Sequence, residues 1–193
     1  MSQVIYPIGI QNFEKIRKDG YLYIDKTAWV YQLVNTGSYY FLSRPRRFGK
    51  SLLLSTIEAY MRGKKELFKG LAIEKLEKEW IEYPILHLDL NARHYKDTDA
   101  LTSILNEHLE RWEALYGNEK QERGLEERFT YVIEQAYKLT GRRVVILIDE
   151  YDKPLLQALH DDVLQEQLRN MLKPFYGVLK TMDGYIKLAF LTG

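Results

Sequence analysis

The sequence predicts an α/β protein in which a mostly parallel sheet is covered by helices on both faces. Apolar runs typical of buried strands alternate with segments whose apolar residues recur at helical spacing. Residues 144–148 consist only of Val, Ile and Leu, a composition that suits a central parallel strand. Strands that alternate with helices build parallel sheets through right-handed crossovers. We therefore expect three layers, α/β/α.

Periodicity and capping residues give the expected elements. Helices are predicted at residues 12–18, 25–34, 53–61, 101–115 and 125–136, and strands at residues 39–42, 85–90, 144–148 and 186–191. Asn12 and Asp25 are the expected N-caps of the first two helices. Residues 64–80 are expected to be irregular and partly helical. A helical pattern resumes near Leu155 and again over residues 164–179, where Pro174 predicts a kink or break.

Composition limits the class of protein. A chain of 193 residues fits one domain, residues 1–193, in which residues 1–37 lead into the core. Hydrophobic residues make up 46% and charged residues 28%, as in ordinary globular proteins. A net charge of +1 creates no global field for nucleic acid or for a membrane surface. The start of the chain lacks the pattern of a signal peptide, and no apolar run reaches the roughly 20 residues of a spanning helix. We expect a cytoplasmic protein.

The first motif with chemical meaning is a strand, a short loop and a helix around Gly49-Lys50-Ser51. This order is typical of the P-loop that cradles phosphates. Gly49 permits a tight turn, and the N–H groups of Gly49, Lys50, Ser51 and Leu52 are available to a phosphate. Lys50 supplies a positive charge for the outer phosphates, and the Ser51 hydroxyl suits Mg²⁺.

The loop departs from the usual G-x-x-x-x-G-K-[ST] pattern, because Arg44 stands where the first glycine belongs and Pro45 follows it. Pro45 has no N–H, so the start of the loop must have a different shape. Arg44, Arg46 and Arg47 add charge that suits phosphate oxygens. Two alternatives stay open: a basic turn before an ordinary helix, and a nucleic-acid contact in which Phe48 stacks on a base.

The second motif is Asp149-Glu150, which directly follows the apolar run 144–148. Ligands of open α/β sheets bind off the carboxyl ends of the strands, so this position suits a Walker B motif. Asp149 would then hold Mg²⁺, and Glu150 would act as general base toward water. The alternative is that Asp149 caps the next helix and Glu150 is simply solvated.

Further candidates depend on weaker signals. His87 and Asp89 share one strand face, which suggests either a hydrogen bond at the edge of the sheet or a place for Asp89 in a magnesium and water network. Three tyrosines, Tyr21, Tyr23 and Tyr31, are candidates for the walls of an adenine pocket.

Three segments together resemble one family: Gly20–Thr27, Arg44–Ser51 and Ile148–Pro154. They resemble the AAA-ATPase-like family of bacterial and archaeal proteins, which often carry a nuclease-like domain of the PD-(D/E)XK type at the C-terminus. Arg44 matches that family's own variant loop. The resemblance also implies that Thr192 faces the γ-phosphate as a sensor. It further implies an AAA-like domain that is truncated at its C-terminus, with a fifth strand, a lid and later domains beyond Gly193, and it leaves a homo-oligomer open.

The leading hypothesis is an AAA-like P-loop domain that binds ATP and Mg²⁺ and hydrolyses ATP in the complete protein. The expected nucleotide-binding residues are Arg46, Arg47, Phe48, Gly49, Lys50, Ser51, Leu52 and Thr192; the metal ligands are Ser51 and Asp149; the catalytic residues are Lys50 and Glu150. Two alternatives remain: a P-loop small-molecule kinase, and a non-hydrolysing switch that nucleotide merely orders. The adjacent Asp-Glu pair suits water activation better than transfer to a bound acceptor.

Overall fold

A parallel sheet organises the molecule. The computed structural model describes residues 5–45 and 47–193. Within them, the strands β1 (Tyr39–Leu42), β2 (Ile85–Asp89), β3 (Val144–Asp149) and β4 (Ile186–Thr192) form one sheet in the order β1-β4-β3-β2. All three strand pairs are parallel. The expected parallel sheet is therefore confirmed, and β2 ends at Asp89, one residue earlier than predicted.

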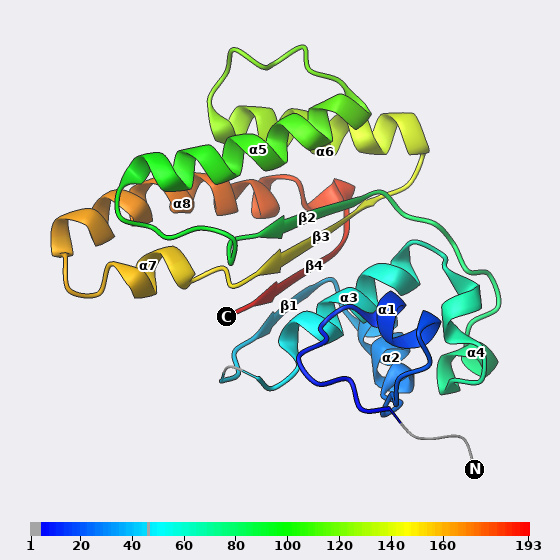
Figure 1. The fold of residues 1–193 in the computed structure, drawn as a ribbon. Helices are drawn as coiled ribbons and strands as arrows, with labels where there is room; N and C mark the ends of the chain where they lie inside the picture. Colours follow the sequence, from blue (N-terminus) through cyan, green and yellow to red (C-terminus); the bar gives the residue numbers. More distant parts are fainter. Residues whose placement is uncertain (1–4, 46) are drawn as a thin grey trace.

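Helices cover both faces of the sheet (Figure 1). One side carries α1 (Phe13–Lys18), α2 (Thr27–Thr36), α3 (Lys50–Met61), a 3-10 turn (Lys65–Phe68) and α4 (Ala72–Leu76). The other carries α5 (Thr98–Tyr116), α6 (Leu125–Thr140), α7 (Lys153–Gln157), α8 (Asp162–Thr181) and a 3-10 turn (Asp183–Tyr185). In the described part of the chain, none of these helices is long and apolar enough to cross a membrane.

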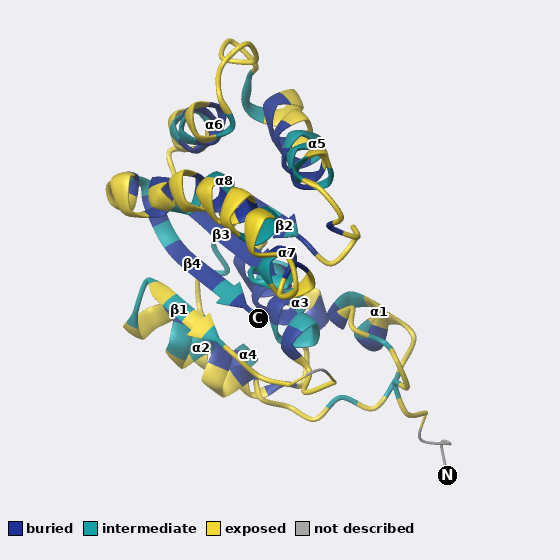
Figure 2. Ribbon diagram, turned by 90° about the vertical axis from the view of Figure 1, so that its left-hand side faces the viewer, coloured by how far each residue is buried: buried dark blue, intermediate teal, exposed yellow. Residues whose placement is uncertain are grey.

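The two cores lie on opposite faces of β3, whose residues are all buried. Val144, Ile146 and Ile148 pack with the helices α5, α6 and α8, whereas Val145 and Leu147 pack on the side of α3. Successive side chains of a strand point to opposite faces, so a strand between two helical layers needs apolar residues at every position. Figure 2 shows the buried strand β3 inside the molecule and the edge strand β1 partly exposed.

The start of α2 corrects one expectation. Lys26, not Asp25, is the N-cap residue, and the helix begins at Thr27. The Asp25 carboxylate still serves the helix, because one oxygen accepts hydrogen bonds from Thr27 N (2.9 Å) and Thr27 Oγ1 (2.7 Å). Its other oxygen accepts from Ala72 N at 2.7 Å, and Thr27 Oγ1 accepts from Ile73 N at 3.1 Å. This arrangement, the Asp25–Thr27 clasp, joins the N-terminal ends of α2 and α4.

The prediction of a break at Pro174 is wrong. Helix α8 continues from Asp162 to Thr181 with Pro174 inside it. Proline removes one backbone donor, but the packed face of the helix offsets this loss. The buried residues of α8 are Leu168, Leu172, Phe175, Val178 and Leu179. Phe175 stacks on Phe129 of α6 with ring centres 4.5 Å apart, which holds the segment just after the proline.

Candidate functional site

Three chain segments meet at the carboxyl edge of the sheet. They meet because β4 lies between β1 and β3, so the ends of these three strands are neighbours. The loop after β1 is held against the end of β4 by Arg44 N, which donates to Gly193 O at 3.2 Å. The turn after β3 is held there by Tyr151 N, which donates to Thr192 O at 2.9 Å. The two sequence motifs therefore occupy one place in the fold.

The loop delivers the N-terminus of α3 to this edge. Gly49 is the N-cap residue in the left-handed conformation, with φ 78° and ψ 20°. That conformation favours glycine, which explains the residue at this position. Leu53 N donates to Gly49 O at 2.9 Å, so the N–H groups of Lys50, Ser51 and Leu52 precede the first helical hydrogen bond. They form the donor end of the helix dipole, which favours anions.

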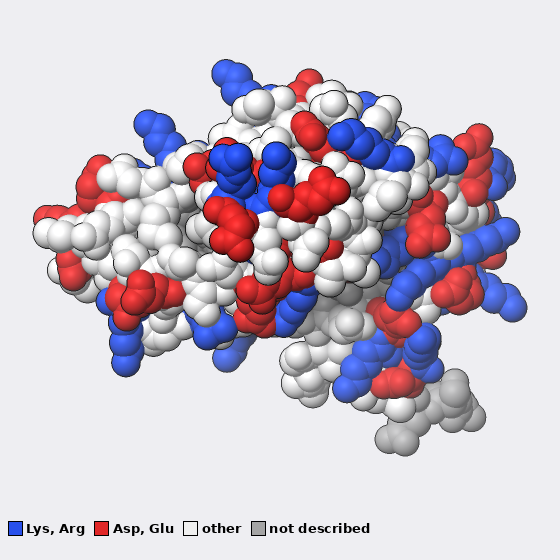
Figure 3. Space-filling model, turned by 90° about the horizontal axis from the view of Figure 1, so that it is seen from above, with Lys and Arg blue, Asp and Glu red and all other residues white. Residues whose placement is uncertain are grey.

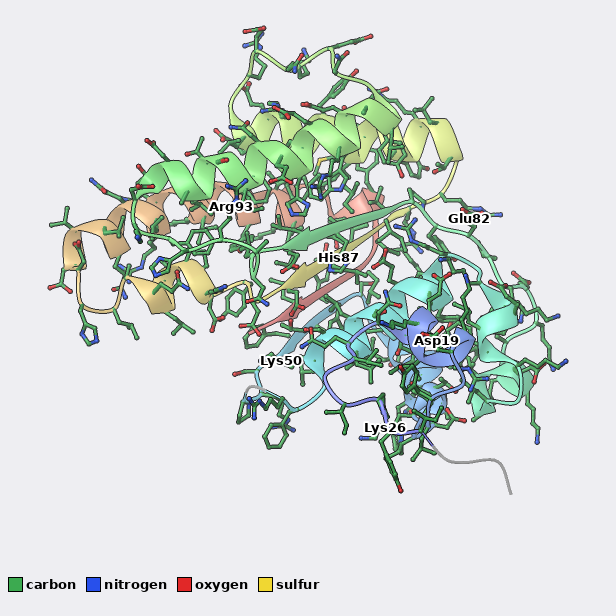
Figure 4. The ribbon with its side chains drawn as sticks, viewed as in Figure 1. Asp19, Lys26, Lys50, Glu82, His87 and Arg93 are labelled. Atoms are coloured by element: carbon green, nitrogen blue, oxygen red, sulfur yellow. The ribbon has the colours of Figure 1, made fainter. Side chains whose placement is uncertain are left out.

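Lys50 joins the two motifs directly. Its side chain is only 6% exposed, and its ammonium donates to Arg44 O at 2.8 Å. The same Nζ lies 3.4 Å from Glu150 Oε1. The positive charge of Lys50 is thus balanced by the carboxylate of Glu150, which follows β3. Figure 4 labels Lys50 at the carboxyl end of the sheet.

A second buried contact lies beside it. Thr192 Oγ1 donates to Asp149 Oδ1 at 2.5 Å, and both residues are buried. The contact forms because β3 and β4 are adjacent and parallel, with Ile148 opposite Leu191. A hydrogen bond to a carboxylate is charge-assisted, so it fixes the orientation of Asp149.

Glu150 adopts an unusual backbone conformation. Its φ is 55°, in the left-handed region that residues other than glycine seldom adopt. Arg47 in the loop does the same, with φ 70°. The turn at Glu150 is fastened on its far side by Lys153 N, which donates to Glu150 O at 3.1 Å. Strained residues of this kind concentrate at functional sites.

The remaining candidates are spread around this centre. Ser51 and Leu52 are half-buried in the first turn of α3. Phe48 is 71% exposed, so its ring is free for a bound ligand or for solvent. Arg46 lies outside the described residues. Tyr31 lines a cavity at the opposite end of the sheet, and the adenine-pocket hypothesis for Tyr21, Tyr23 and Tyr31 stays a prediction.

Sequence reasoning missed two residues on the far side of the site. Lys153 Nζ donates to Asn91 O at 2.5 Å and to Asn91 Oδ1 at 2.9 Å. Asn91 N in turn donates to Asp89 Oδ1 at 2.7 Å, and Asp89 lies opposite Asp149 in the sheet. No sequence pattern pairs Lys153 with Asn91, because only the β2–β3 register brings them together.

The donor set fits an anion with a divalent cation. Free N–H groups and Lys50 suit phosphate oxygens, while the Ser51 hydroxyl and the Asp149 carboxylate are the oxygen ligands that Mg²⁺ prefers. Within residues 5–45 and 47–193, no group of three or more His, Cys, Asp or Glu side chains could hold a metal by itself. Mg²⁺ often binds through one or two protein groups together with substrate phosphates, so this set is sufficient.

Fold and site together define a parallel α/β protein with a strand–loop–helix turn at the carboxyl edge of its sheet. The family described as a predicted AAA-ATPase matches residues 7–193, and the chain belongs to this AAA-ATPase-like family. Membership supports a nucleotide-binding, ATPase-like role in general terms.

One curated relative extends the comparison. A protein of Azotobacter chroococcum mcd 1, described as an uncharacterized protein in the vnfD 5′ region, is 39% identical over 194 residues. The match covers 100% of this chain and 38% of that protein. The chain therefore spans well under half the length of this relative. No solved structure matches significantly.

Proposed function

We propose that this chain is a P-loop domain that binds ATP and Mg²⁺, and that the complete protein hydrolyses ATP to ADP and phosphate. The observation that carries the proposal is the contact of Lys50 with Glu150, which unites the glycine–lysine–serine turn with the acidic pair. A buried lysine at a helix N-terminus beside two carboxylates suits a phosphate–magnesium complex. Membership of a family described as a predicted AAA-ATPase supports the same conclusion.

Binding would rearrange the charges of the site. Phosphate oxygens accept from the N–H groups of Lys50, Ser51 and Leu52, and they draw the Lys50 ammonium away from Arg44 O and Glu150. Ser51 and Asp149 would hold Mg²⁺, which would offset the charge of the outer phosphates. Phe48 and Arg47, which are exposed in the loop, would contact the nucleotide.

Release of Glu150 from Lys50 frees a base for the chemical step. Glu150 accepts a proton from a water molecule as the water oxygen bonds to the γ-phosphorus. The bond between the γ-phosphorus and the oxygen bridging to the β-phosphate breaks, and ADP leaves with that oxygen. Thr192, whose hydroxyl holds Asp149, would respond to the γ-phosphate. Lys50 stabilises the charge on the transferred phosphoryl group.

Phosphate release by the complete protein tests the chemical step. The complete protein is needed because the chain matches 38% of the length of its relative. Glu150→Gln keeps the shape of the side chain but cannot take a proton, so turnover should fall by about 10²–10⁴. Affinity for MgATP should be unchanged or higher, because the neutral amide no longer holds Lys50.

Each other outcome has a defined meaning. Equal loss of affinity and turnover in Glu150→Gln would show that Glu150 is structural and would contradict the proposal. Tight MgATP binding by the wild-type protein with no phosphate release would favour the nucleotide-ordered switch. Phosphate transfer to an added acceptor in preference to water would favour a small-molecule kinase.

A further inference from the structure

A cavity of about 290 Å³ lies at the opposite end of the sheet from the candidate site. Its wall residues include Tyr31 and Asn35 of α2, Tyr60 at the end of α3, Glu79 and Tyr83 before β2, and Lys187 at the start of β4. We call it the Tyr60 cavity. Its volume is close to the lower limit of known small-molecule pockets, about 300 Å³.

The Tyr60 cavity is distinct from the candidate site. Lys187 is the second residue of β4, whereas Thr192 ends that strand at the carboxyl edge. Tyr60 and Met61 end α3, and Lys50 begins it. Because each helical residue adds about 1.5 Å along the axis, the two ends of α3 lie more than 15 Å apart. In Figure 4, the labelled Lys50 and Glu82 lie at opposite ends of the sheet.

One wall of the cavity is fixed by a carboxylate. The Tyr60 hydroxyl donates to Glu77 Oε2, and Glu77 Oε1 accepts from Lys78 N at 2.7 Å and Glu79 N at 2.8 Å. Burial and the neighbouring Glu77 raise the pKa of Tyr60, so the hydroxyl stays a donor. The segment is also tied to α3 by Tyr83 N, which donates to Met61 O at 2.8 Å.

This wall is held in a strained conformation. Trp80 has φ 47°, in the left-handed region that a bulky residue rarely adopts. Its ring packs edge-on against Tyr60 at 5.8 Å and lies 5.3 Å from the Phe68 ring. Such conformations persist only where surrounding contacts enforce them, and they are common at ligand clamps.

The lining carries two carboxylates, Glu77 and Glu79, and two lysines, Lys78 and Lys187, so its formal charges cancel. Glu77 is already satisfied by three donors, and Lys78 Nζ donates to Lys75 O at 2.9 Å. Lys187 is half-buried and forms no ion pair with any other described residue, whereas Glu79 is exposed. A charge that is shielded from water acts more strongly than one that solvent screens. Lys187 is therefore the charged group of the lining that is open to an anionic group of a ligand.

The aromatic walls define the rest of the ligand. Tyr31, Tyr60 and Tyr83 are among the lining residues, and an aromatic ring offers a flat face that suits a planar ring. We propose that the Tyr60 cavity is a second binding site, for a small planar aromatic molecule that carries one anionic group. In this arrangement the ring lies among the tyrosines and the anion contacts Lys187.

Ligand-observed NMR titration with three matched probes tests this proposal. The probes are 4-hydroxybenzoate, the neutral 4-hydroxybenzamide and the cationic 4-hydroxybenzylamine. Wild-type protein should bind the benzoate most tightly. Lys187→Met should weaken benzoate binding by about tenfold or more, the size expected for losing a hydrogen bond to a charged group. Glu79→Gln should strengthen it, because the competing carboxylate is removed.

Lys180→Met is the matched control, because this substitution removes the same charge from an exposed residue of α8. It should leave benzoate affinity unchanged, and thermal melting establishes that each variant is folded. Failure of the wild-type protein to bind the benzoate would overturn the proposal. Equal or tighter binding of the amide or amine, or equal benzoate affinity in Lys187→Met and wild type, would also overturn it.

Discussion

At the scale of single residues, the hydrogen bond between Thr192 and Asp149 links two strands at the candidate site. Thr192 is completely buried, and its hydroxyl donates to Asp149 Oδ1 at 2.5 Å. The bond needs the hydroxyl and not only the volume of the side chain. A buried carboxylate oxygen that loses its hydrogen-bond donor has neither water nor a protein partner, and this lowers the stability of the folded state.

Thr192→Val should therefore lower the free energy of unfolding by about 1–3 kcal/mol, because valine keeps the shape but removes the donor. Urea denaturation measures the change. Thr181→Val is the matched control, since Thr181 is exposed on α8 and its hydroxyl contacts only Gly177 O, at 3.3 Å. Equal stability of Thr192→Val and the wild type would show that the Asp149 contact contributes nothing to the fold.

Residue types are readable in the sequence at this scale, but their contacts are not. Gly49, Lys50 and Asp149 stand in recognisable patterns because backbone conformation and charge restrict which residues serve there. The contact between Lys50 and Glu150 depends on the order of the strands, which no local pattern encodes. Lys153 and Asn91 escaped notice for the same reason.

At the scale of elements, the Asp25–Thr27 clasp ties two helices together at their N-terminal ends. One carboxylate and one hydroxyl satisfy the first N–H groups of two helices that lie far apart in sequence. Helix α4 has only five residues, too few to be stable alone, so it depends on such contacts. The clasp thereby fixes the segment that leads to the Tyr60 cavity.

Asp25→Ala should lower the free energy of unfolding by about 1–2 kcal/mol or more, because it removes acceptors at two helix N-termini and loss of one such cap costs about 1 kcal/mol. Denaturant unfolding measures the difference. Asp19→Ala is the control, because Asp19 is exposed at the end of α1. A change no larger than that of the control would mean that the clasp is not stabilising.

Element boundaries could be predicted where the signal is local. Asn12 caps α1 as expected, with its side chain accepting from Lys15 N at 2.8 Å. The sequence failed where tertiary contacts decide. Pro174 is tolerated within α8 because the apolar face of the helix is packed against α6. Asp25 precedes the N-cap residue Lys26 by one position, yet its side chain still accepts a hydrogen bond from the first residue of α2.

At the scale of the whole molecule, the alternation of strands and helices predicted the parallel sheet and its two helical layers. It did not predict that the last strand lies between β1 and β3, which is the feature that brings Thr192 to Asp149. Strand order follows from packing among distant segments, for which periodicity carries no information.

The surface agrees with the small net charge of +1. In the view from above, Lys and Arg side chains are mixed with Asp and Glu over the helices (Figure 3). This face carries no continuous basic surface of the kind that tracks a nucleic-acid backbone. The two proposed binding sites therefore depend on local charge, at Lys50 and at Lys187.

The central claim is that nucleotide binds at Lys50, and nucleotide-dependent melting of the chain tests it most directly. A ligand that binds only the folded state raises the melting temperature by mass action. MgATP should raise it for the wild type and for Lys180→Ala, an exposed lysine control, but not for Lys50→Ala, each compared with its own nucleotide-free sample. An equal MgATP-dependent shift in Lys50→Ala and wild type would contradict the assignment of the site.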